Sequence, residues 1–153
     1  MARVHPLLKN ERVRLSLSQE ELAERVGTTP SNVSRWERGI TSPTPYFRRK
    51  LCDPLIAKWV AISGVQVAAW GVKQMKTRWG TCTIGAARIW LNLELIKKPP
   101  HCLEYIVVHE MVHLLERHHN ERFIAHMNRF MPLWRYYREE LNREPLGHAS
   151  WEY

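Results

Sequence analysis

Two histidines and a glutamate in the string VVHEMVH are the residues best suited to chemistry. His109 and His113 are four positions apart, so on a helix they project from one face and can both reach one ion. Neutral imidazoles suit Zn²⁺, which keeps one coordination position open for water at catalytic sites. Glu110 would lie beside that ion, where it could take a proton from the water. This spacing predicts metal-assisted hydrolysis with Glu110 as the general base.

The residues around this triplet are apolar. The stretch 105–108 precedes it, and Met111, Val112, Leu114 and Leu115 surround it. A buried helix would therefore carry two histidines and a carboxylate, which is costly unless these groups have a partner. The pattern favours a metal site over a chance match.

The third ligand is the harder prediction. On a continuous helix His119 would rise about 15 Å beyond His109, so it can contribute only if the helix ends and the chain turns back. The polar run 116–120 could end the helix, and Asn120 could cap the next one. Spacing alone leaves three rivals open: His118, Glu139 and Glu140.

The first third of the chain has the start and stop signals of short helices. Ser18 and Glu21 form a capping-box pattern, and Gly27 is placed to end the helix that follows. Thr29 is a suitable N-cap for the next helix. A further short helix is expected over residues 46–52.

The string LSQEELAERVGTTPSNVSRWERG resembles the helix-turn-helix unit of the Xre/Cro repressor family, over residues 5–52. The resemblance implies that the helix from Pro30 to Arg38 enters the major groove of double-stranded DNA. By position, it implies base-facing roles for Ser31, Asn32 and Arg35 and phosphate contacts for Gln19 and Arg38. A helical mini-domain used only for packing is the competing interpretation.

Residues 54–98 change character, with β-branched and aromatic residues, alternation in ARIWLNLEL and a turn signal at 84–85. Two or three strands are expected, and the strand ending at 91–92 could lie along a cleft as an edge strand. A long helix then begins at the Pro99-Pro100 pair. A second begins near Glu121, and Pro132 should kink or split it.

The strings MKTRWGTC, ARIWLNLEL and PPHCLEYIVVHEMVHLLERHHNERF resemble the YgjP-like metallopeptidases, relatives of the SprT-like proteases, over residues 55–153. The resemblance implies His109, His113 and His119 as ligands of one Zn²⁺, Glu110 as the catalytic glutamate, and a protein or peptide substrate. Longer members of that family carry a further N-terminal stretch, and here the helix-turn-helix pattern occupies its place.

Arg78, in the string MKTRWGTC, has two interpretations. As a fixed positive group it could stabilise the oxyanion of a tetrahedral intermediate. As a structural residue it would stack on Trp79 or pair with a carboxylate. The sequence favours the structural role slightly.

Composition sets the remaining limits. The chain has 153 residues, 44% of them hydrophobic, which is enough for one ordinary domain or two small ones. It has no membrane-spanning run and no signal peptide, so a cytoplasmic location is expected. The net charge of +8 suits an anionic partner such as nucleic acid.

We therefore expect an α+β protein with two domains. Residues 1–53 would form a helix-turn-helix, and residues 54–153 a minimal zincin-like domain with a short antiparallel sheet packed on the HExxH helix and a C-terminal helix. The predicted function is zinc-dependent peptide hydrolysis beside a DNA-binding module. The alternatives are a transcriptional regulator whose zinc domain is a sensor or structural module, and an inactive fusion.

Overall fold

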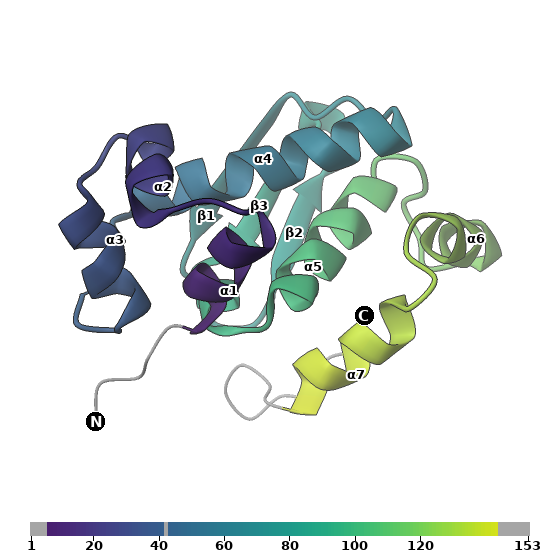
Figure 1. Ribbon diagram of the computed structural model, residues 1–153. Coiled ribbons are helices and arrows are strands. Elements are labelled where there is room, and N and C mark those ends of the chain that lie inside the picture. Colours follow the sequence, from purple (N-terminus) through teal and green to yellow (C-terminus); the bar gives the residue numbers. More distant parts are fainter. Residues whose placement is uncertain (1–5, 42, 144–153) are drawn as a thin grey trace. The chain divides into compact units, whose positions relative to one another are not determined.

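The computed structural model describes residues 6–41 and 43–143 of the chain. The chain divides into two compact units, an N-terminal unit (Met1–Asp53) and a C-terminal unit (Pro54–Tyr153). Figure 1 shows the helices of the first unit in purple and blue. It shows the sheet and later helices of the second in teal, green and yellow.

The N-terminal unit begins with three short helices, α1 (Pro6–Arg14), α2 (Gln19–Val26) and α3 (Pro30–Glu37). The predicted capping box is confirmed, because Ser18 Oγ accepts from the Glu21 N–H at 3.0 Å and Glu21 Oε2 accepts from the Ser18 N–H. Gly27 ends α2 with a left-handed φ of 74°. Thr29 caps α3 by accepting from the Asn32 N–H.

The three helices enclose a small apolar core made of Leu22, Ala23, Val26, Val33 and Trp36. Beside it, the buried Glu37 carboxylate accepts hydrogen bonds from Arg12 Nε at 2.6 Å and from Gln19 Nε2 at 2.7 Å. These bonds tie α1 and the start of α2 to the end of α3. A buried carboxylate with two such donors has its charge compensated.

Replacing Arg12 by Met is expected to destabilise the N-terminal helices strongly. The substitution removes the cation that compensates Glu37, whose side chain is only 4% exposed. Breaking a buried ion pair on one side costs roughly 3 kcal/mol or more. Urea unfolding followed by circular dichroism measures this loss. The matched control is Arg25→Met on the exposed side of α2, and an equal loss in both variants would contradict the prediction.

The fourth helix is longer than predicted. Instead of ending near Cys52, α4 runs from Pro45 to Ser63, with Pro54 inside it. Proline lacks the N–H for one helical hydrogen bond, but Ile56 and Trp59 on the following turns are buried in the core of the C-terminal unit. That burial offsets the lost bond. The boundary between the two units falls inside this helix.

The sheet differs from the expected antiparallel one. Strands β1 (Ala69–Lys73), β2 (Gly80–Thr83) and β3 (Arg88–Asn92) lie in the order β1-β3-β2. The β2–β3 pair is antiparallel and joined through the short 3₁₀ helix η1 (Ile84–Ala86), as the turn signal predicted. The β1–β3 pair is parallel. The sheet is mixed because residues 74–79 carry the chain past the end of β3 before β2 begins.

Because β3 is the central strand, it is not the expected edge strand. Its backbone pairs with β1 on one side and β2 on the other, so it has no free edge to offer an extended peptide. The edges of this sheet belong to β1 and β2.

After β3, the 3₁₀ helix η2 (Leu93–Lys97) leads to α5 (Pro100–Val112), α6 (Glu121–Phe130) and α7 (Trp134–Arg143). The split at Pro132 is confirmed, since α6 ends at Phe130 and α7 begins at Trp134. Helix α5 packs against β2 and β3 and also against α6 and α7, as its central place in Figure 1 suggests. It is buried at nearly every position from Cys102 to Val112. The result is a mixed α+β unit built around one apolar helix.

In the described part of the chain, we find no helix with both the length and the apolar character needed to span a membrane.

Candidate metal centre

Three histidines meet where α5 ends and the chain turns back toward α6. His109 lies on the last turn of α5, and His113 is the residue at which the helix ends. Residues 114–120 then reverse the chain, and Asn120 caps α6 by accepting from the Phe123 N–H at 3.1 Å. This reversal brings His119 back to the two histidines of α5.

The imidazole nitrogens converge on a point. His119 Nε2 lies 3.2 Å from His109 Nε2 and 3.0 Å from His113 Nε2. Nitrogen ligands about 2.0–2.1 Å from a tetrahedral zinc ion would be about 3.3–3.4 Å apart. The spacing therefore fits three ligands on one ion closely, with small adjustments.

Phe123 supports all three rings at once. Its ring centroid lies 4.9 Å from that of His109, 4.8 Å from that of His113 and 4.7 Å from that of His119. It is 2% exposed and follows the N-cap of α6. The spacing of four residues between His119 and Phe123 is the sequence signal for this contact.

The environment keeps the three imidazoles neutral. Burial lowers the pKa of His109 well below its usual value, and repulsion from His113 and His119 adds to this effect. The pKa values of His113 and His119 are also lowered, mainly by burial. Neutral imidazoles are the form that binds metal, so the site is prepared for a cation.

Glu110 is buried beside this cluster, and one of its carboxylate oxygens is unsatisfied. Oε1 has no hydrogen-bond partner among the described residues. Burial raises the Glu110 pKa to about 8, while the positive charge of Arg78 opposes the shift. A buried polar atom without a partner is costly, and a bound cation with its water would supply both charge and hydrogen bonds. The residues present fit a metal ion.

Gly80 allows strand β2 to approach Glu110 closely. A Cβ atom at this position would lie 2.8 Å from Glu110 Oε1 and 2.8 Å from Ile106 Cγ2. Neither contact is tolerable without movement, because Glu110 and Ile106 are both buried. The absence of a side chain at Gly80 therefore helps to fix the position of the Glu110 carboxylate.

Substituting Gly80 by Ala is expected to displace Glu110 and to destabilise the C-terminal unit by roughly 1–3 kcal/mol, because the added methyl overpacks the site. Metal binding should persist, since the nearest atoms that the added methyl would meet belong to Glu110 and Ile106 and not to the three histidines. Thermal unfolding and metal content measure the two effects. Gly85→Ala is the control, because a Cβ there meets nothing within 4 Å; equal stability of the two variants would refute the argument.

The loop that carries Arg78 is held by a buried amide. Asn92 Nδ2 donates to the carbonyl oxygens of Met75 at 2.8 Å and Arg78 at 2.7 Å. The Asn92 N–H also donates to the carbonyl of Trp79 at 2.8 Å. Sequence reasoning placed Asn92 on a strand but missed this role. Its position at the end of the central strand was the available signal.

Arg78 is exposed, and its charge is close enough to act on Glu110. In the described part of the chain it makes no ion pair and does not stack on Trp79; the Trp79 ring instead has Lys98 Nζ 5.6 Å from its centroid. Neither of the two structural contacts considered for Arg78 is therefore present among the described residues.

The rival ligands lie elsewhere. His118 is exposed and outside the cluster. Glu140 pairs with His101 Nε2 at 2.5 Å, and Glu139 is exposed on α7.

The residues predicted to contact DNA are not equally available. Ser31, Arg35 and Arg38 are exposed on or just after α3. Asn32 is partly buried, with its amide donating to Thr28 Oγ1 at 3.0 Å. The amide of Gln19 is bound to Glu37. The side-chain amides of Gln19 and Asn32 therefore already make hydrogen bonds within the N-terminal unit.

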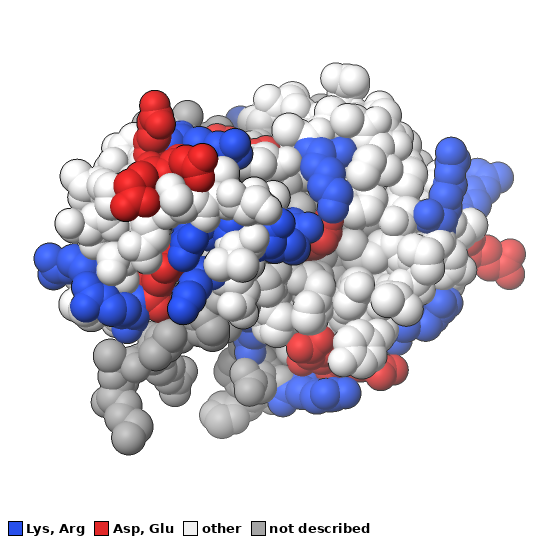
Figure 2. All heavy atoms as spheres, viewed as in Figure 1, with Lys and Arg blue, Asp and Glu red and all other residues white. Residues whose placement is uncertain are grey.

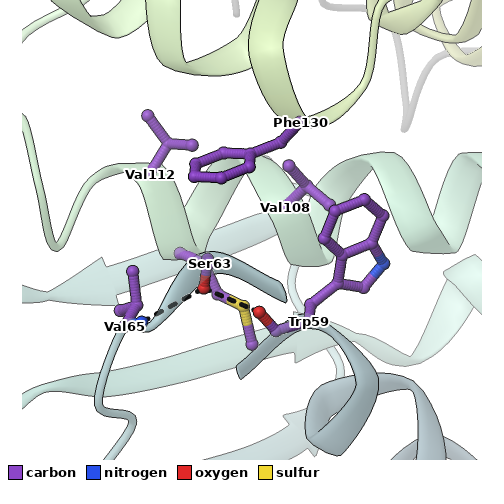
Figure 3. A pocket seen from close by; sticks show the side chains of 7 residues that line it. Trp59, Ser63, Val65, Val108, Val112 and Phe130 are labelled. Carbon is purple, nitrogen blue, oxygen red and sulfur yellow. Dashed lines mark hydrogen bonds between the residues drawn. The ribbon is translucent and has the colours of Figure 1, made fainter. Parts of the chain in front are cut away.

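An apolar pocket lies on another face of α5. Figure 3 shows Trp59, Val108, Val112 and Phe130 around it, with the Ser63 hydroxyl turned to the Trp59 carbonyl and the Val65 N–H. The pocket has no room for a water molecule, and none of the three histidines lines it. It is a gap in apolar packing, separate from the candidate metal centre.

Comparison with known proteins identifies the class. The model of the YgjP-like metallopeptidase domain matches residues 8–144, so the chain belongs to the YgjP-like metallopeptidase family. The match begins far before residue 55, where the sequence resemblance was expected to start, and includes the short N-terminal helices. Our prediction had considered only the segment that holds the recognisable strings.

A solved structure shares the fold. The metallopeptidase zymogen abylysin of Pyrococcus abyssi is similar with a TM-score of 0.53 and 17% identity, over 57% of this chain and 88% of that protein. At this identity the likeness shows the fold alone. Among curated proteins, none has a sequence that matches this chain.

Proposed function

We propose that the chain is a zinc-dependent peptidase whose ion is held by His109, His113 and His119. The observation that carries the proposal is the convergence of three imidazole nitrogens beside a buried carboxylate with an unsatisfied oxygen. An all-nitrogen set of three ligands leaves one position open, which is the arrangement of catalytic zinc sites. Membership of a metallopeptidase family supports the same reaction.

Zinc, when bound, would supply a Lewis acid that polarises the peptide carbonyl and lowers the pKa of water. Glu110 takes one proton from the attacking water while the water oxygen forms a bond to the carbonyl carbon. The carboxyl group then passes this proton to the amide nitrogen as the C–N bond breaks, so one residue acts first as base and then as acid. The second proton of the water leaves the new carboxyl group for the amine, so the products are a carboxylate and a protonated amine.

Arg78 is proposed to act on the same step. Its guanidinium is exposed and positive near Glu110, and its backbone carbonyl is held by Asn92. A positive group fixed at the site can stabilise the oxyanion that forms when water adds to the carbonyl. The Asn92 amide would then act as a positioning group for Arg78.

The proposal is tested by removing and restoring the metal. Wild-type protein is dialysed against a chelator, and cleavage of a casein or mixed-peptide substrate is followed by mass spectrometry before and after Zn²⁺ is returned. Cleavage should be lost and then recovered. Protein that carries as little zinc as a His109→Ala/His113→Ala variant would refute the metal site itself.

A second proposal concerns the N-terminal unit, for which we infer double-stranded DNA as a partner, with residues 1–53 as a helix-turn-helix domain. The supporting observation is that Ser31, Arg35 and Arg38 are exposed on or just after the capped helix α3. On the face seen in Figure 2, Lys and Arg side chains lie among Asp and Glu side chains.

Selection of bound sequences from random duplexes, followed by gel-shift titration, tests this second proposal. Binding should weaken as salt rises, and Arg35→Ala should weaken it further. Indifference to both changes would exclude it. DNA binding together with zinc but without cleavage would favour the regulator alternative, in which the zinc domain is a sensor or structural module.

A further inference from the structure

We propose a second metal-binding site, separate from the histidine triad, formed by His101, Cys102 and Glu140. The imidazole nitrogen, the sulfur and the carboxylate oxygen offered by these residues all lie within 4.8 Å of one another. His101 and Cys102 are on the first turn of α5, and Glu140 comes from α7. The site would take a borderline-soft divalent ion, Zn²⁺ or Co²⁺, and water.

The site has a buried side, formed by Cys102, and a more exposed rim, formed by His101 and Glu140. Cys102 is fully buried beneath, with its Sγ 4.0 Å from the Tyr137 carbonyl. His101 and Glu140 are 36% and 24% exposed, and their Nε2 and Oε2 atoms are 2.5 Å apart. An ion can therefore arrive from solvent and replace the direct contact between these two side chains. The ring of Tyr137, 4.9 Å from that of His101, supports the imidazole.

The donor set is the second argument. One nitrogen, one sulfur and one carboxylate oxygen match the ligands that zinc uses in proteins, and thiolate ligands distinguish zinc and cobalt from magnesium and calcium. The thiol is protonated when no metal is present, because burial and the Glu140 charge raise the Cys102 pKa to about 12. A bound ion would drive this proton into solvent. Lys98 is the nearby positive group that favours the thiolate.

The two sites are separated along one helix. His101 precedes His109 by eight residues, a rise of about 12 Å along α5. They therefore cannot share an ion. A metal at the second site would join the first turn of α5 to α7, which already pack together. We assign it a structural effect: it would stabilise the contact between these two helices.

The simpler interpretation is that His101 and Glu140 form an ordinary ion pair above a buried thiol. Cobalt distinguishes the two. The protein is stripped with a chelator, loaded with Co²⁺ and examined for the near-ultraviolet charge-transfer absorption of a thiolate bound to cobalt. The triad holds no sulfur, so this absorption reports only the second site. Metal content is measured on the same samples.

We expect the absorption in wild type. In Cys102→Ser we expect the absorption to disappear and the metal content to fall by one ion. Glu140→Gln changes a rim residue only, so it serves if Cys102→Ser does not fold; it should weaken cobalt binding about 10-fold or more. Cys82→Ser, on β2, is the matched thiol control and should keep the absorption.

Absence of the absorption from wild type, or its persistence in folded Cys102→Ser, would overturn the proposal. Failure of the triad is recognised separately, because His109→Ala/His113→Ala would then hold as much metal as wild type. The two proposals can thus fail independently.

Discussion

Replacing Glu110 by Gln should abolish peptide cleavage while leaving zinc in place. The change keeps the size of a side chain that is 2% exposed and packed against Gly80, so the fold has little reason to move. It removes the group that we propose accepts the proton from water. General acid–base groups contribute about 10²- to 10⁴-fold to a rate, and Glu110 serves in both steps. We therefore expect a loss near the upper end of that range.

The measurement pairs the cleavage rate with zinc content for the same preparation. Zinc content should stay equal to that of wild type, because the proposed ligands are histidines. The control is Glu116→Gln, in the turn between α5 and α6, which changes a carboxylate near the triad but outside its ligand set. Cleavage by Glu110→Gln at the wild-type rate would disprove the assigned mechanism.

The parts of the fold that sequence could predict are those decided by neighbouring residues. The capping box at Ser18, the Asn120 cap and the split at Pro132 all depend on groups within a few positions. The HExxH helix is recognisable for the same reason. Its apolar residues are continuous, and the spacing of its two histidines is a property of the helix itself.

The parts that sequence could not predict depend on distant groups. The parallel pairing of β1 with β3 follows from the path of residues 74–79, which no strand pattern encodes. Helix α4 continues through Pro54 because Ile56 and Trp59 find a core far along the chain. Likewise, the sequence suggested a phosphate contact for Gln19. In the structure its amide donates a hydrogen bond to Glu37, eighteen residues later.

The candidate site shows the same division. The spacing of the α5 histidines is local, but the position of His119 depends on how residues 114–120 reverse the chain. Gly80 approaches Glu110 from strand β2, and Asn92 on the central strand holds the loop that carries Arg78. No periodic pattern in the sequence indicates these contacts, so they can be recognised only from the paired strands of the structure.

Substituting His119 by Ala should weaken zinc binding by more than about 100-fold, because it removes one of the three proposed ligands, and even groups that merely orient ligands are worth about 10- to 100-fold. Stability without metal should change little, since His119 is exposed. The substitution also removes the packing of its ring on Phe123, which leaves His109 and His113 less constrained. Competition against a chromophoric chelator measures the zinc affinity of each variant.

His118→Ala is the decisive control, because His118 is adjacent, exposed and equally able to bind zinc in isolation. The turn directs His119, not His118, toward His109 and His113. We therefore expect wild-type affinity in His118→Ala and a large loss in His119→Ala. The reverse order would mean that the loop adopts another arrangement when metal binds. Equal small losses would mean that the third ligand comes from outside this turn, and the assigned ligand set would then be wrong.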